Sequence, residues 1–192
     1  MIRVWIVALV LLAGGCAANP PPEVANKEPP KFLNLSPASL GRSMSLSQRA
    51  TGQYGEKVHK MHLELDVSPE RIAIVGLTPL GVTLFTIVHQ RGEVEVETLG
   101  RSGVDFDPRY TLFDVYLTYW PAEELRPALS RMGLVLEDAM DGALRRIRGP
   151  DGETMVEITY SPNHLKTGEI IIRHFDIPYL LRIETVAARE TG

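Results

Sequence analysis

Residues 71–88 read RIAIVGLTPLGVTLFTIV, and this stretch decides the fold. Two runs rich in Ile, Val, Leu and Thr flank the segment Thr78-Pro79-Leu80-Gly81. β-Branched and aromatic residues favour strands, and Pro and Gly favour a tight turn. The stretch therefore predicts two consecutive antiparallel strands joined by a short turn, with Leu80 where turns are normally polar.

Alternation of apolar and polar residues continues on both sides of this hairpin. It is clearest in KMHLELDV (60–67) and EVEVETL (93–99), and strand-like runs return at 134–138, 143–148, 153–160, 170–177 and 179–185. A period of two is typical of strands with one buried face. Sequential strands joined by short turns predict an antiparallel meander.

The middle of the chain, residues 106–130, has a helical period instead. Asp107 is expected to cap a helix that begins at Pro108, and Pro121 is expected to end that helix and begin a second, shorter one. A long antiparallel sheet tends to curl, and helices between its strands can cover the concave face. We therefore expect a mainly β protein with an α insertion (α+β), a curved antiparallel half-barrel of about 9–11 strands with a helical lid.

The concave face of such a sheet is expected to be apolar and to form a ligand cavity. The residues predicted to line it are Leu63, Ile72, Ile74, Leu84, Phe85, Phe113, Leu117 and Trp120. An equally compatible alternative is that these side chains pack under the helices as a solid core.

The N-terminus has the features of a bacterial lipoprotein signal. One positive charge, an apolar run and small residues precede Cys16, the only cysteine of the chain. Residues 1–15 are predicted to be a signal peptide, and Cys16 resembles the lipidated cysteine of a lipobox. The Pro-rich residues 16–31 are predicted to form a tether, and a disordered linker without a length requirement is equally compatible; residues 32–192 are predicted to form one folded domain. Ala17 after the cysteine favours the outer membrane under bacterial sorting rules; the alternative is an ordinary secreted protein with an unmodified cysteine.

Nothing in the sequence indicates an enzyme or a cofactor site. The formal net charge of −4 gives no basic excess, so nucleic acid is not an expected partner. The five histidines and the carboxylates show no metal-ligand spacing, and the motifs of hydrolases and metalloproteases are absent. We expect no catalytic residue, no metal and no cofactor. Arg145, Arg146 and Arg148 form a basic patch on one predicted hairpin, which by default is solvated.

Three segments resemble LolB, the outer-membrane receptor that accepts lipoproteins from the periplasmic carrier LolA. They are LTPLGVTLFTI (77–87), YWPAEELRPAL (119–129) and RRIRGPDGETMVEITY (145–160). GRSMSLSQRATGQYG (41–55) and GLTPLG (76–81) are similar, nearly word for word, to a family of uncharacterised bacterial lipoproteins associated with gene clusters for aryl-polyene pigments or related lipids. The resemblance implies a LolA/LolB-like fold.

The resemblance also implies a function. The protein would be an outer-membrane lipoprotein, facing the periplasm, that acts as a non-enzymatic receptor or carrier for a lipid-like or acylated molecule. Leu80, with Pro79 and Gly81 beside it, would contact the membrane or the ligand, and a LolA-like carrier is a possible partner. The alternatives are a structural protein that anchors an envelope biosynthesis or export complex, and an esterase-like envelope enzyme.

Overall fold

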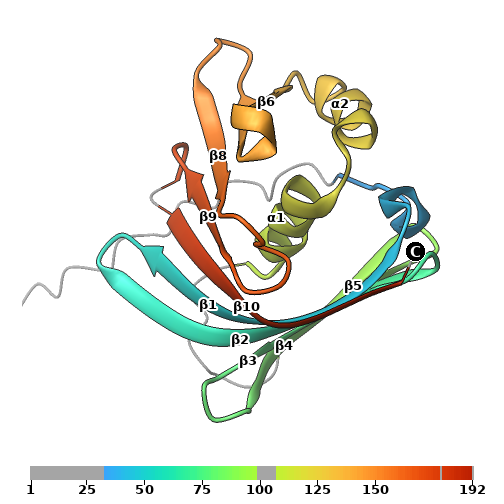
Figure 1. The fold of residues 1–192 in the computed structure, drawn as a ribbon, viewed down its shortest axis with the longest axis vertical. Helices are drawn as coiled ribbons and strands as arrows, with labels where there is room; N and C mark the ends of the chain where they lie inside the picture. The colour runs from blue at the N-terminus through green and yellow to red at the C-terminus, as the bar shows by residue number, and fades with distance from the viewer. Residues whose placement is uncertain (1–32, 99–106, 178, 192) are drawn as a thin grey trace, which may run out of the picture.

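The computed structural model describes residues 33–98, 107–177 and 179–191 (Figure 1). The predicted signal peptide, Cys16 and the tether lie outside the described residues. Within this part of the chain there are ten strands, two α-helices and two short 3-10 helices. The strands are β1 (Ser43–Tyr54), β2 (Lys57–Val67), β3 (Arg71–Leu77), β4 (Thr83–Gln90), β5 (Glu93–Thr98), β6 (Val135–Ala139), β7 (Leu144–Arg148), β8 (Thr154–Tyr160), β9 (Glu169–His174) and β10 (Tyr179–Thr191). The helices are η1 (Pro37–Leu40), α1 (Arg109–Tyr119), α2 (Ala122–Ser130) and η2 (Met140–Gly142).

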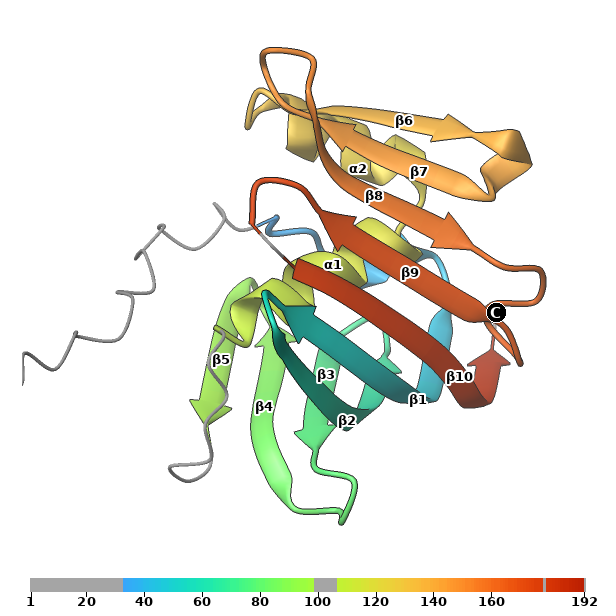
Figure 2. The same ribbon diagram turned by 90° about the vertical axis from the view of Figure 1, so that its left-hand side faces the viewer.

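All ten strands form one curved antiparallel sheet in the order β5-β4-β3-β2-β1-β10-β9-β8-β7-β6. Each half of the sheet is a five-stranded meander, as the alternating sequence pattern predicts. The two halves join where β1 pairs with β10, from Ser43 opposite Thr191 to Tyr54 opposite Tyr179 (Figure 2). The predicted antiparallel sheet with about 9–11 strands is therefore confirmed.

This strand order explains where the helices lie. β5 and β6 follow one another among the strands, yet they form the two opposite edges of the sheet. The chain between them must cross the whole sheet, and α1 does so inside the curve (Figure 1). α2 packs against β6 at the far edge. The predicted first helix begins at Arg109, one residue later than expected, and the Asp107 carboxylate accepts a hydrogen bond from the Arg109 N–H at 3.0 Å.

The sheet bends at irregular positions. The pairing register shifts between Ser47 and Gln48 in β1 and between Gly76 and Leu77 in β3. Such bulges increase local twist and curvature. Gly76 lies opposite Phe85, whose ring covers the space that a Gly76 side chain would occupy, with Cε1 at 2.3 Å from an added Cβ.

The residues predicted to line the ligand cavity are mostly core residues of this structure. Seven are almost fully buried in one apolar cluster with α1: Leu63, Ile72, Ile74, Phe85, Phe113, Leu117 and Trp120. Leu84 alternates with Phe85 along β4 and is only partly buried. Side chains from α1 and from the sheet fill the concave side where they meet, which agrees with the solid-core alternative. Entry of a ligand between them stays a prediction.

Candidate functional site

The turn between β3 and β4 presents an apolar tip. The Thr78 N–H donates to the Val82 carbonyl at 2.8 Å, the Gly81 N–H donates to the Thr78 carbonyl at 2.9 Å, and the Val82 N–H donates to Thr78 Oγ1 at 3.0 Å. Gly81 has φ +81°, a value that glycine adopts without strain. The hydrogen-bonded turn leaves the Leu80 side chain 92% exposed and Val82 61% exposed. Leu80 therefore points away from the core, and its contact with a membrane or ligand stays a prediction.

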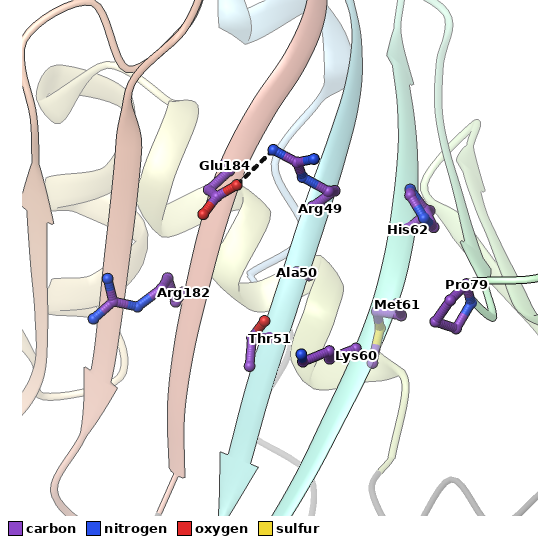
Figure 3. A pocket seen from close by; sticks show the side chains of 9 residues that line it. All are labelled: Arg49, Ala50, Thr51, Lys60, Met61, His62, Pro79, Arg182 and Glu184. Carbon is purple, nitrogen blue, oxygen red and sulfur yellow. Dashed lines mark hydrogen bonds and ion pairs between the residues drawn. The ribbon is translucent and has the colours of Figure 1, made fainter.

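A surface pocket of about 290 Å³ adjoins this turn on β1, β2 and β10 (Figure 3). Pro79 connects the two features, because it lines the pocket beside β2 while Leu80 extends from the same turn. The lining residues are Arg49, Ala50, Thr51, Lys60, Met61, His62, Pro79, Arg182 and Glu184. Three of them are cations and one is a carboxylate, so the pocket carries net positive charge.

The cations of this pocket differ in how they are compensated. Arg49 Nη2 lies 2.8 Å from Glu184 Oε2, the pair drawn in Figure 3, and Arg182 Nη1 lies 2.5 Å from Glu169 Oε1. Among the described residues the structure gives Lys60 no ion pair. An exposed apolar tip beside basic side chains is a combination typical of proteins that touch anionic lipid surfaces.

Two buried polar pairs hold α1 against the sheet. Asp114 Oδ1 lies 2.8 Å from His174 Nε2 on β9, and both side chains are almost fully buried. Tyr116 Oη lies 2.5 Å from His89 Nδ1 on β4 and donates to the Leu35 carbonyl at 3.2 Å. The two pairs attach the helix to opposite halves of the sheet. Sequence reasoning missed both; the available signal was Asp114, the one carboxylate between Arg109 and Trp120.

The pKa values of the two histidines move in opposite directions. Burial lowers the pKa of His174, but the charge and hydrogen bond of Asp114 outweigh burial and raise it above the ordinary value. Burial lowers the pKa of His89, and burial raises the pKa of Tyr116 above its usual range. His174 therefore favours the charged form against Asp114, whereas His89 favours the neutral form against the Tyr116 hydroxyl.

The basic patch predicted on the late hairpin, formed by β7 and β8, is neutralised by carboxylates on the neighbouring strands. Arg145 pairs with Asp138 at 2.8 Å, and its Nη1 also donates to the Leu117 and Trp120 carbonyls at the end of α1. The other two arginines pair in the same way, Arg146 with Glu157 at 2.9 Å and Arg148 with Glu137 at 2.8 Å. These side chains fasten the hairpin to its neighbours and to α1.

Other classes of site have no counterpart in the part of the chain that the structure describes. No three His, Cys, Asp or Glu side chains there come together in a way that could hold a metal ion. Neither of the two α-helices found there has the length and apolar character that crossing a membrane requires.

Comparison with known proteins places most of the folded part in one family. A family model described as "Protein of unknown function (DUF3261)" matches residues 45–187. Among curated proteins the sequence finds no match.

Similar solved structures include a LolA superfamily protein from Nitrosomonas europaea, with TM-score 0.45 and 7% identity over 83% of this chain and 92% of that chain. A candidate outer membrane lipoprotein-sorting protein domain from Vibrio parahaemolyticus has TM-score 0.45 and 9% identity over 80% and 86% of the two chains. A DUF1329 family protein from Desulfovibrio piger has TM-score 0.39 and 9% identity over 77% and 85%.

Proposed function

The chain belongs to the DUF3261 family, and we propose that it is an envelope lipoprotein that receives or carries a lipid-like or acylated molecule. The lipobox-like segment ending at Cys16 supports anchoring in the outer membrane, with the domain in the periplasm. The three LolB-like segments support a role in handling acyl chains. The role is non-enzymatic, and the product of an aryl-polyene or related lipid gene cluster is a candidate cargo.

The observation that carries this proposal is the exposure of Leu80 on a hydrogen-bonded turn. Burying a leucine side chain gains about 1.5–3 kcal/mol, which is too little to hold a protein on a membrane by itself. A lipid anchor at Cys16 would already hold the domain near the surface. Leu80 then needs only to enter the acyl region or to meet an acyl chain, while the cations of the adjoining pocket face the headgroups.

Carriage of a chain inside the sheet requires a change in α1. Leu117, Trp120 and the facing strand residues fill the space between α1 and the sheet. The pairs Asp114–His174 and Tyr116–His89 would have to open with the helix, and water would then satisfy their polar atoms. A LolA-like periplasmic carrier is the proposed partner in transfer.

A second candidate function is assembly. A structural lipoprotein that anchors an envelope complex needs no cavity, and the filled concave face favours this alternative. Its contacts would come from the sheet edges β5 and β6 or from the late hairpin.

Native mass spectrometry tests the carrier proposal. The full chain with Cys16→Ser, which removes the anchor's own acyl mass, is purified from cells that carry its neighbouring genes and is then incubated with membranes. We expect an added mass that organic extraction removes, and we expect Leu80→Glu to lower its occupancy at least tenfold. Met140→Glu is the matched control, because Met140 is 73% exposed on the β6–β7 turn. A bare protein mass in every sample would contradict the carrier function and favour assembly.

A further inference from the structure

The convex face of the sheet is ordered in rows, because directly paired residues of antiparallel strands point to the same side. It is the face away from α1, since the alternate residues Met61 and Leu63 of β2 belong to the core. The first row, beside the β1–β2 and β9–β10 turns, consists of Val58, Gln53, Leu180 and Arg173. The second row, two residues further along each strand, consists of Lys60, Thr51, Arg182 and Ile171. Figure 3 shows Lys60, Thr51 and Arg182 side by side on three neighbouring strands.

Cations gather in these two rows and carboxylates do not. Lys60, Arg173 and Arg182 are exposed, and neither row contains Asp or Glu. Among the described residues only Arg182 of the three has an ion pair, with Glu169 of the next row at 2.5 Å. On β2 the first carboxylate of this face is Glu64, two rows beyond Lys60. The convex face is therefore basic at this end of the sheet and becomes acidic away from it.

Exposed apolar side chains border the same two rows. Val58 in the first row is 57% exposed. Pro79 lines one pocket together with Lys60, and Figure 3 shows it beside β2, so the β3–β4 turn ends next to the second row. This turn carries Leu80, which is 92% exposed. Exposed apolar side chains beside cations are typical of surfaces that bind anionic membranes.

We propose that Val58, Lys60, Leu80, Arg173 and Arg182 form a docking face for a bilayer that contains anionic phospholipid. Val58 and Leu80 enter the boundary between headgroups and acyl chains, and the three cations meet phosphate groups. Charge favours this occupant, because an anionic surface attracts the basic end of the convex face and repels the acidic residues beyond it. The inference rests on the proposed membrane contact of Leu80 and extends it from one side chain to an oriented face with a lipid preference.

Flotation of the Cys16→Ser chain with two kinds of vesicle tests the docking face. One kind contains phosphatidylcholine alone, and the other contains phosphatidylcholine mixed with phosphatidylglycerol. We expect binding to the mixed vesicles to be about 25-fold tighter, because the two unpaired cations each favour an anionic surface about fivefold. The preference should diminish at high salt, which screens exposed charges.

Two matched pairs of variants locate the docking face. Lys60→Gln is expected to weaken binding to the mixed vesicles about fivefold, whereas Lys166→Gln, in the β8–β9 loop at the opposite end of the sheet, should leave it unchanged. Val58→Ala should weaken binding about tenfold, whereas Val186→Ala, equally exposed at 57% but further along β10, should not weaken it. All four positions are exposed, so the melting temperatures are expected to match that of the parent chain.

The possible outcomes separate this inference from the proposed function. Equal binding to both kinds of vesicle, or equal binding of the two variants in either pair, would overturn the docking face. If only Leu80→Ala weakens binding, the membrane contact at Leu80 stands and the wider face does not. Binding to neither kind of vesicle would overturn both the docking face and the membrane contact at Leu80, whereas carriage of a cargo is decided separately by native mass spectrometry.

Discussion

Replacement of Leu80 by alanine tests the apolar tip quantitatively. Because the side chain is 92% exposed in the free protein, nearly all of its apolar surface is available for burial in a membrane. Removing three carbon atoms, at about 0.8 kcal/mol each, is expected to cost about 2 kcal/mol of membrane affinity, which is about a 30-fold weaker partition. The same exposure means that the free energy of unfolding should change by less than about 0.5 kcal/mol.

The assay is flotation of the Cys16→Ser chain with vesicles that contain anionic lipid, so that the anchor does not mask the contribution of the turn. Met140→Ala serves as the control, because Met140 is also strongly exposed but lies on the β6–β7 turn. Equal partition of Leu80→Ala and the parent chain would refute the reasoning. An equal loss of membrane partition in Met140→Ala would show that any exposed apolar side chain contributes to binding, whichever turn carries it.

Three further predictions concern the core and α1. Gly76→Ala places a Cβ 2.3 Å from Phe85 Cε1 and should lower the free energy of unfolding by about 1–3 kcal/mol, whereas Gly52→Ala, with its nearest neighbour at 3.7 Å, should leave it nearly unchanged in urea titration. Asp114→Asn removes the nearer of the two carboxylate charges that face His174, the other being Asp176 at 3.9 Å, and should destabilise the protein by about 3 kcal/mol, as measured by the same titration; a change below about 0.5 kcal/mol would contradict a structural role for the pair. The pKa of His174 is raised in the folded state, so the stabilisation that the Asp114–His174 pair gives the fold is fully present below the pKa of an unfolded histidine, about 6.5. This stabilisation is lost as the pH rises through the pKa of His174 in the folded protein. The difference in unfolding free energy between the parent and Asp114→Asn should therefore shrink from pH 6 to pH 9, and a growing difference would contradict the assigned direction.

The candidate site was predictable where it depended on local chemistry. The Thr78-Pro79-Leu80-Gly81 segment predicted a turn with an apolar tip, and the structure places Leu80 there in the solvent. Pairs of distant residues were not predictable. Asp114 and His174 are 60 residues apart, so no local pattern brings them together.

The sequence alone determined the local structure of this protein. Alternation with a period of two specified the strands, Pro and Gly specified the turns, and a 3.6-residue period around Leu112 and Tyr116 specified the first helix, because these signals act between residues close in the chain. The tertiary structure decided that β1 pairs with β10, which makes β5 and β6 the two edges and sends α1 across the concave face. It also decided that side chains fill that face. Both features depend on contacts between residues far apart in the sequence, whose stability comes from the shared burial of apolar surface.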